Sequence, residues 1–206
     1  VSGMVARSWA RQAAQGAFVV VPAMRGVDGG GSSSAQDASG REIYDINDAI
    51  NYASSNFSTV VDTNMVVAMG YSGGGGNVLN YASRFPDSAA VVVDHFGITD
   101  YGYNTTWGWY QAGASGGQQS ALVAYIGNTP TLAPDNYRAR SAVEALPRNY
   151  GGHVYIFHDD QDASVPIAQS RALVTNLVTY GRSYTTNFTT TTNAVRWSHA
   201  NPNDSA

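Results

Sequence analysis

Unbroken runs of apolar residues recur along the chain, and longer stretches of mixed polarity separate them. A strand that is buried on both faces of a parallel sheet has no polar side, so it reads as such a run. This pattern predicts buried strands over residues 17–21, 65–69, 89–93 and 153–157. Alternation of Tyr, Thr and Phe predicts a last, edge strand over 184–192.

The stretches between these runs place apolar residues three and four positions apart, which is the spacing of amphipathic helices. Helices are therefore expected over residues 5–15, 43–54, 77–84, 135–145 and 167–180, with a short helix over 121–126. Strands that alternate with helices indicate an α/β protein whose central sheet is mostly parallel, with helices on both faces. No change of composition divides the chain, so residues 1–206 are expected to form a single domain.

Composition narrows the classes of protein that fit this fold. The formal net charge is −4, all 11 basic residues are arginine, and they form no cluster, which argues against nucleic acid as a partner. The absence of cysteine excludes disulfides, thiolate metal sites and a cysteine nucleophile. No apolar run reaches the roughly 20 residues of a membrane span. The lack of lysine and the many Thr, Asn and Gly residues favour a secreted, extracellular protein.

The most informative stretch is the apolar run that enters Gly70-Tyr71-Ser72-Gly73-Gly74 and leaves it as a helix. This is the layout of a nucleophile elbow, a tight strand-to-helix turn in which flanking glycines relieve the crowding. The turn exposes the Ser72 hydroxyl at the edge of the sheet. It also places the Gly73 amide at a helix N-terminus, where it can stabilise an oxyanion.

A serine nucleophile needs a base within hydrogen-bond reach. The chain has four histidines, and His153 is expected to be a strand-edge residue. His95 and His158 are placed at strand ends, on the same edge of the sheet as the elbow. His199 follows the last strand, and it is the expected base in the chain order Ser, acid, His.

The base in turn needs a carboxylate that orients it. Asp162 is the best candidate, because it lies in the turn that follows the buried strand 153–157. Asp159 and Asp160 are close enough to compete, and Asp94 also follows a strand. Each of these three has an alternative role as a turn or capping carboxylate.

Aromatic residues gather in the irregular stretch from Gly97 to Gln119, among them Trp107 and Trp109. Together with Tyr71 of the elbow, these rings are candidates for substrate binding, through stacking on a sugar, an aromatic acyl group or a peptide side chain. The alternative is that they only pack the loop against the domain, and the sequence leaves both open.

These motifs, taken in order, resemble the α/β-hydrolase superfamily. They are most similar to serine hydrolases related to the prolyl oligopeptidase catalytic domain and to dienelactone-hydrolase-like esterases. The matching segments are residues 16–26, 42–52, 61–76, 84–87, 97–100 and 158–166, the last with Asp159 where glycine is usual. Carried over by position, the resemblance implies Ser72 as nucleophile, Asp162 as acid and His199 as base.

The resemblance also implies strands ahead of the first helix, one of which ends in a His-Gly loop that supplies a second oxyanion amide. The printed sequence begins at about that helix and contains no His-Gly pair. We therefore expect a domain that is N-terminally incomplete relative to the family. If its sheet is reduced in this way, a partner chain is expected to cover the exposed sheet edge.

The expected activity is acyl transfer without metal or organic cofactor. We expect an esterase acting on small-molecule or carbohydrate esters. The alternatives are a small serine peptidase of the prolyl oligopeptidase type, or a non-catalytic hydrolase-like module that serves in assembly or surface binding.

Overall fold

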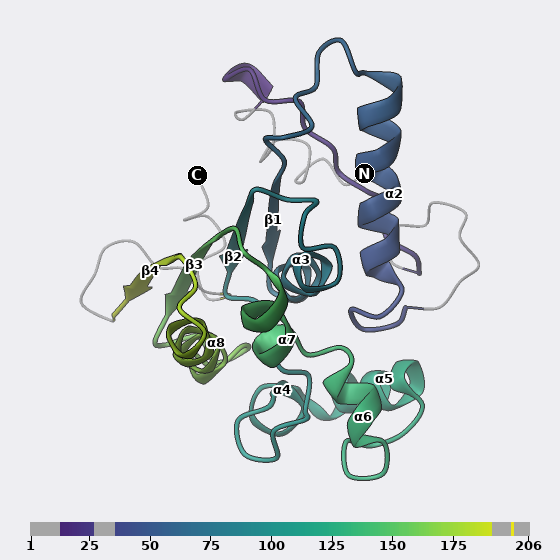
Figure 1. The fold of residues 1–206 in the computed structure, drawn as a ribbon. Coiled ribbons are helices and arrows are strands. Elements are labelled where there is room, and N and C mark those ends of the chain that lie inside the picture. Colours follow the sequence, from purple (N-terminus) through teal and green to yellow (C-terminus); the bar gives the residue numbers. More distant parts are fainter. Residues whose placement is uncertain (1–12, 27–35, 191–198, 200–206) are drawn as a thin grey trace.

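The computed structural model describes residues 13–26, 36–190 and 199, and its centre is a parallel sheet of four strands (Figure 1). The strands lie side by side in the order β1-β2-β3-β4, which is also their order in the sequence. Register pairs Tyr71 with His95 and His95 with Phe157, so the carboxyl ends of the first three strands meet at one edge. Their bounds are β1 Val67–Tyr71, β2 Val91–His95, β3 His153–Asp159 and β4 Tyr184–Thr189.

The helices fall into two groups along the chain. Four of them pack beside the sheet, namely α2 (Glu42–Asn56), α3 (Gly73–Arg84), α7 (Ala142–Asn149) and α8 (Ala168–Thr179). Three shorter ones belong to the stretch between β2 and α7, namely α4 (Trp109–Ala112), α5 (Gly116–Ile126) and α6 (Pro134–Arg138). The predicted α/β architecture with a parallel sheet is confirmed, and the predicted helices over 43–54, 77–84 and 167–180 correspond to α2, α3 and α8.

Burial alternates from residue to residue along the strands, so one face of the sheet holds the core. Val92, Val154 and Ile156 are fully buried and pack against Leu79 of α3 and Leu173 of α8. Each fully buried aliphatic side chain of this kind contributes roughly 1.5–3 kcal/mol. The described helices α2, α3, α7 and α8 lie on this face (Figure 1). The helix predicted over residues 5–15 lies mostly outside the described residues.

The prediction of a strand over residues 17–21 is wrong, because the backbone there is neither helix nor strand. Phe18, Val20 and Val21 are 39–45% exposed, and the ring of Phe18 packs on Phe57 at 4.9 Å. A strand needs a neighbour for its backbone hydrogen bonds. Residues 17–21 pair with no strand in the part of the chain that the structure describes.

One predicted helix is divided in two. In place of a helix over 135–145, α6 ends at Arg138 and α7 begins at Ala142. Ser141 between them has an extended backbone, and its hydroxyl donates to the carbonyl of Tyr137 at 2.8 Å and accepts from the amide of Tyr101 at 3.0 Å. Serine side chains compete for backbone groups in this way and interrupt helices. The same hydroxyl attaches the loop that follows β2 through its hydrogen bond with Tyr101. That loop is less irregular than predicted, because it contains α4 and the start of α5.

Candidate active site

The turn between β1 and α3 has the strained backbone of a nucleophile elbow. Ser72 has φ 55° and ψ −125°, a conformation that few non-glycine residues adopt. The turn requires glycine at position 70, since a Cβ there would lie 2.1 Å from the carbonyl oxygen of Gly74. The Ser72 amide donates to the carbonyl of His95 at 2.9 Å, and the Ser72 carbonyl accepts from Gly76 at 3.1 Å. These bonds fix the serine between the sheet and the helix.

The structure brings Ser72, His199 and Asp162 into one hydrogen-bonded chain. Nε2 of His199 lies 2.7 Å from Oγ of Ser72, and Nδ1 of His199 lies 2.8 Å from Oδ2 of Asp162. The backbone amide of His199 also donates to Oδ2 of Asp162, at 3.2 Å. These contacts span 127 positions of sequence between Ser72 and His199, and they have the order and geometry of a Ser-His-Asp triad.

The electrostatics of Asp162 suit an ionised carboxylate that orients a histidine. Its side chain is fully buried, and burial by itself would raise its pKa. The hydrogen bond from His199 and the amides of Val165 and Ser164, at 3.0 and 2.9 Å, outweigh that effect, so the pKa of Asp162 lies below its ordinary value. A buried carboxylate that is so supported stays charged at neutral pH and can stabilise an imidazolium.

The three competing carboxylates have other partners. Asp159 accepts a hydrogen bond from the Thr189 hydroxyl at 2.9 Å, which joins β3 to β4. Asp160 accepts from the side chain of its neighbour Gln161 at 3.1 Å. Asp94 is fully buried on the face of the sheet that packs against α3, in space that Gly75 leaves open. Burial raises the pKa of Asp94 to about 7, although the Gly97 amide opposes the rise.

The other histidines serve the scaffold. His95 ends β2 and is stacked between Tyr71 and Phe157, with ring centroids at 4.5 and 4.8 Å. His158 is fully buried, and its ring nitrogens are 2.7 Å from the Ser170 hydroxyl and 2.8 Å from the Val165 carbonyl. Burial lowers the pKa of both rings, that of His95 to about 4. His158 closes the turn that carries Asp162, with its Nε2 3.9 Å from the carboxylate.

Gly73 takes the position that an oxyanion donor needs. It is the first residue of α3, and the first amides of a helix have no acceptor within the helix. Its amide therefore belongs to the partly positive end of the helix, directly after the serine.

The aromatic residues of the stretch after β2 are held by the protein itself. Trp107 packs against the main core, and its carbonyl accepts from the buried side chain of Gln169 at 2.9 Å. Trp109 donates its indole N–H to the carbonyl of Ser164 at 2.8 Å and contacts the ring of Tyr101. Tyr71 lies on the sheet against His95. These contacts fit the packing alternative for Trp107 and Trp109, and substrate binding by Tyr71, Trp107 and Trp109 stays a prediction.

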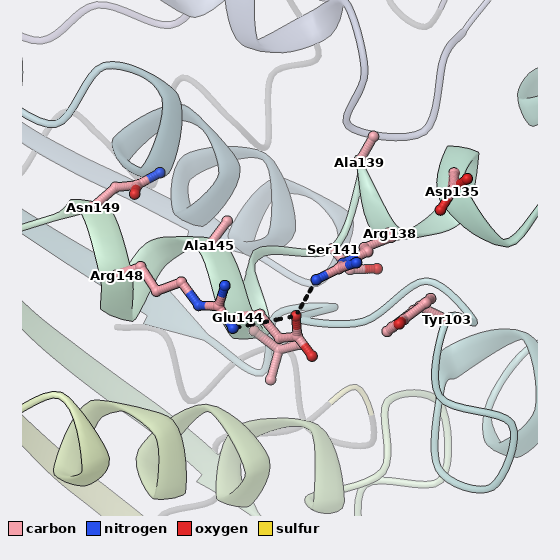
Figure 2. A pocket seen from close by; sticks show the side chains of 10 residues that line it. Tyr103, Asp135, Arg138, Ala139, Ser141, Glu144, Ala145, Arg148 and Asn149 are labelled. Atoms are coloured by element: carbon pink, nitrogen blue, oxygen red, sulfur yellow. Dashed lines mark hydrogen bonds and ion pairs between the residues drawn. The ribbon is translucent and has the colours of Figure 1, made fainter.

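Two adjoining hollows open beside α7, with volumes of about 430 and 360 Å³, and they share Tyr103, Val143 and Glu144. Figure 2 shows the first of them. In the first, Arg138 and Arg148 approach Glu144 at 3.2 and 4.0 Å. Their lining residues include neither Ser72 nor Asp162, so neither hollow is the space in front of the nucleophile.

Two residues near the site were not singled out by the sequence. Gln169 is fully buried, and its side chain accepts from the amides of Thr99 and Asp100 and donates to the carbonyls of Asp100 and Trp107. Phe96 follows β2 with φ 42° and touches the ring of His199. Gln169 follows shortly after the segment 158–166 that resembles the family. A single glutamine or phenylalanine in a sequence nevertheless gives no sign that its side chain will lie beside the site.

Within the described ranges no group of three or more acidic, histidine or cysteine side chains could hold a metal ion. None of the helices described is long and apolar enough to cross a membrane.

The parallel sheet and the elbow at Ser72 define the fold class, which is the α/β-hydrolase fold. A model of the prolyl oligopeptidase family of peptidases matches residues 5–195, which is nearly the whole sequence. The chain belongs to that family. No curated protein matched the chain.

Solved structures of peptidases share the fold. An acylaminoacyl peptidase of Pyrococcus horikoshii superposes with a TM-score of 0.64 at 17% identity over 80% of this chain and 24% of its own. A puromycin-hydrolyzing peptidase of Mycobacterium tuberculosis superposes with a TM-score of 0.63 at 18% identity, over 75% of this chain and 22% of its own. Dipeptidyl peptidase 4 of Porphyromonas gingivalis superposes with a TM-score of 0.56 at 16% identity, over 71% of this chain and 19% of its own. The chain thus spans about a fifth to a quarter of each of these proteins.

Proposed function

We propose that this chain carries the catalytic site of a serine peptidase. The observation that carries the proposal is the hydrogen-bonded chain Ser72–His199–Asp162, with Nε2 of His199 at 2.7 Å from the serine oxygen. Membership of the prolyl oligopeptidase family favours a peptide substrate over the ester that we expected from the sequence, and the similar structures are peptidases.

In the proposed reaction, Oγ of Ser72 attacks the carbonyl carbon of the scissile bond while Nε2 of His199 takes the hydroxyl proton. Asp162 stabilises the imidazolium, and the Gly73 amide donates to the oxyanion. The C–N bond then breaks as His199 passes the proton to the leaving amine. Water, deprotonated by His199, attacks the acyl-enzyme, which releases the acid and returns the proton to Ser72.

The test combines a fluorophosphonate probe with matched amide and ester substrates. Wild-type protein is expected to be labelled at Ser72 and to hydrolyse peptidyl aminomethylcoumarins, and Ser72→Ala is expected to lose labelling and about 10⁶-fold in kcat. Ser164→Ala, a change at an exposed serine of the acid turn, is the matched control and keeps both.

The substrate panel decides between the alternatives. Labelled protein that hydrolyses p-nitrophenyl esters but no peptide amide would overturn the peptidase proposal in favour of an esterase. Folded protein that the probe does not label would be a non-catalytic module.

A further inference from the structure

Two neighbouring strands end in the same unusual way. Tyr71 of β1 and His95 of β2 are the last paired residues of their strands, and the next residues, Ser72 and Phe96, both have positive φ, of 55° and 42°. Ser72 is the elbow serine, whereas Phe96 has no such role assigned. A bulky residue with this backbone is a genuine outlier, and it persists only where the surroundings enforce it.

The surroundings of Phe96 hold it from two sides. Its amide donates to the carbonyl of Phe157 at 2.7 Å, which ties the turn to β3. Its side chain is 9% exposed. The ring packs against Tyr71 at 5.9 Å and His158 at 6.4 Å, so it fills the space between the elbow strand and the strand that leads to Asp162.

The strained backbone directs the ring onto the base. The centroids of the Phe96 and His199 rings are 4.8 Å apart, with the planes inclined at 61°. This is the tilted arrangement that aromatic pairs prefer. The contact joins a residue of the core to a histidine that is otherwise held by hydrogen bonds at its two ring nitrogens and its amide.

Those hydrogen bonds leave one motion of the imidazole open. The bonds to Asp162 and Ser72 leave the ring from opposite nitrogens, close to its plane, and so resist sliding and in-plane rotation. They resist rotation about the Nδ1–Nε2 axis much less, since hydrogen bonds tolerate moderate changes of angle. A ring packed at an inclined angle against the imidazole restricts this rotation, and the Phe96 ring lies 4.8 Å from the His199 ring with the planes inclined at 61°.

We infer that Phe96 is a positioning residue for the reaction: its ring, turned inward by the left-handed backbone, holds His199 in the plane from which Nε2 faces the Ser72 hydroxyl. The inference rests on the proposed function, because it concerns the base of that site. Phe96 itself touches neither the serine oxygen nor, in this scheme, the scissile bond.

The variants separate the ring from the backbone. Phe96→Leu keeps an apolar side chain but removes the ring, and Phe96→Gly removes the ring and accepts positive φ without strain. Phe85→Leu is the control, because Phe85 also packs against aromatic rings, those of Tyr44 and Tyr81, but does not contact His199.

The readouts are the second-order rate of fluorophosphonate labelling, kcat and KM for a peptidyl aminomethylcoumarin, and the melting temperature. Both Phe96 variants are expected to label and turn over about 10- to 100-fold more slowly with KM changed less than twofold, since small misplacements of catalytic groups have effects of this order. Phe85→Leu is expected to stay within twofold in rate whatever its melting temperature.

The outcomes distinguish the inference from the function on which it rests. Wild-type protein that labels, together with Phe96→Leu and Phe96→Gly that label within twofold of it, overturns the role of Phe96 and leaves the proposed function standing. Wild-type protein that does not label overturns both. A loss of rate that Phe85→Leu shares in proportion to its loss of stability also overturns the positioning role.

Discussion

The indole N–H of Trp109 donates a hydrogen bond to the carbonyl oxygen of Ser164 at 2.8 Å, across 55 positions of sequence. Trp109 begins α4, and Ser164 lies in the turn whose amides hold Asp162. The aromatic stretch after β2 is therefore attached to the turn that carries Asp162.

Replacement of Trp109 by phenylalanine is expected to loosen this attachment. The variant keeps an aromatic ring but lacks the donor, so kcat should fall by about threefold to tenfold, which corresponds to a hydrogen bond of roughly 1 kcal/mol. KM for peptide substrates should stay unchanged, as measured by steady-state kinetics. Ser164→Ala retains the accepting carbonyl and should behave like wild type. A rise in KM with kcat unchanged would instead mark Trp109 as a substrate contact.

Asp162→Asn is the sharpest test of the acid. The amide cannot stabilise an imidazolium and favours the wrong tautomer of His199, so kcat should fall by roughly 10⁴-fold. The control is Asp160→Asn in the same turn, whose carboxylate bonds only Gln161 among the described residues. Peptide hydrolysis by both variants, measured on protein shown to be folded, tests whether Asp162 is the acid. Near-normal turnover by Asp162→Asn would rule out Asp162 as the acid.

Three of the predicted apolar runs correspond to β1, β2 and β3. Burial alternates along these strands, so one face of the sheet is buried in the core and the other is partly exposed among the described residues, whereas the runs predicted burial on both faces. The run at 17–21 has the same composition but no strand beside it among the described residues, and a pattern of side chains does not reveal a backbone partner. The helix break at Ser141 was not predicted for a related reason. It depends on the hydrogen bond that the Ser141 hydroxyl accepts from the amide of Tyr101, which lies 40 positions away in the sequence.

The site divides in the same way. Ser72, Asp162 and His199 could be chosen in advance because their order, and the turns around the first two, limit where a nucleophile and its partners can lie, and the structure brings the three together. The contact of Phe96 with His199 depends on the positive φ of Phe96, and a phenylalanine among apolar residues gives no sign of such a backbone in the sequence. The sequence left open whether Trp109 contacts substrate or packs the loop, and the hydrogen bond of its indole to the Ser164 carbonyl is visible only in the fold.

Asp94 is expected to make the protein less stable as the pH rises. Burial raises its pKa from 3.8 to about 7, so the folded state favours the protonated form more than the unfolded state does. Its favourable contribution is complete below about pH 4 and is lost as the pH rises through 7. Between pH 5 and pH 8 this costs roughly 2–3 kcal/mol of unfolding free energy.

Asp94→Asn removes that titration at nearly constant shape. Urea unfolding at pH 5 and pH 8 should show a smaller decline for Asp94→Asn than for wild type, while the exposed Asp87→Asn should follow wild type. Equal declines in all three proteins would show that Asp94 does not carry the pH dependence.

His95 is expected to act in the opposite direction, on the acid side. Its imidazole is stacked between Tyr71 and Phe157 with interplanar angles of 19° and 12°, and burial lowers its pKa from 6.5 to about 4. The folded state thus favours the neutral ring. The stability this gives is present above pH 6.5 and is lost as the pH falls toward 4. Between pH 7 and pH 4.5 the loss amounts to roughly 2 kcal/mol.

His95→Phe should keep the stack and remove this loss, so its unfolding free energy should fall less between pH 7 and pH 4.5 than that of wild type. Part of the decline should remain, because burial also lowers the pKa of His158. His153→Asn serves as the control, since His153 bonds Ser183 and Thr185 on the sheet surface and is not stacked between two rings as His95 is. If His95→Phe loses as much stability as wild type over this range, protonation of His95 is not what destabilises the protein in acid.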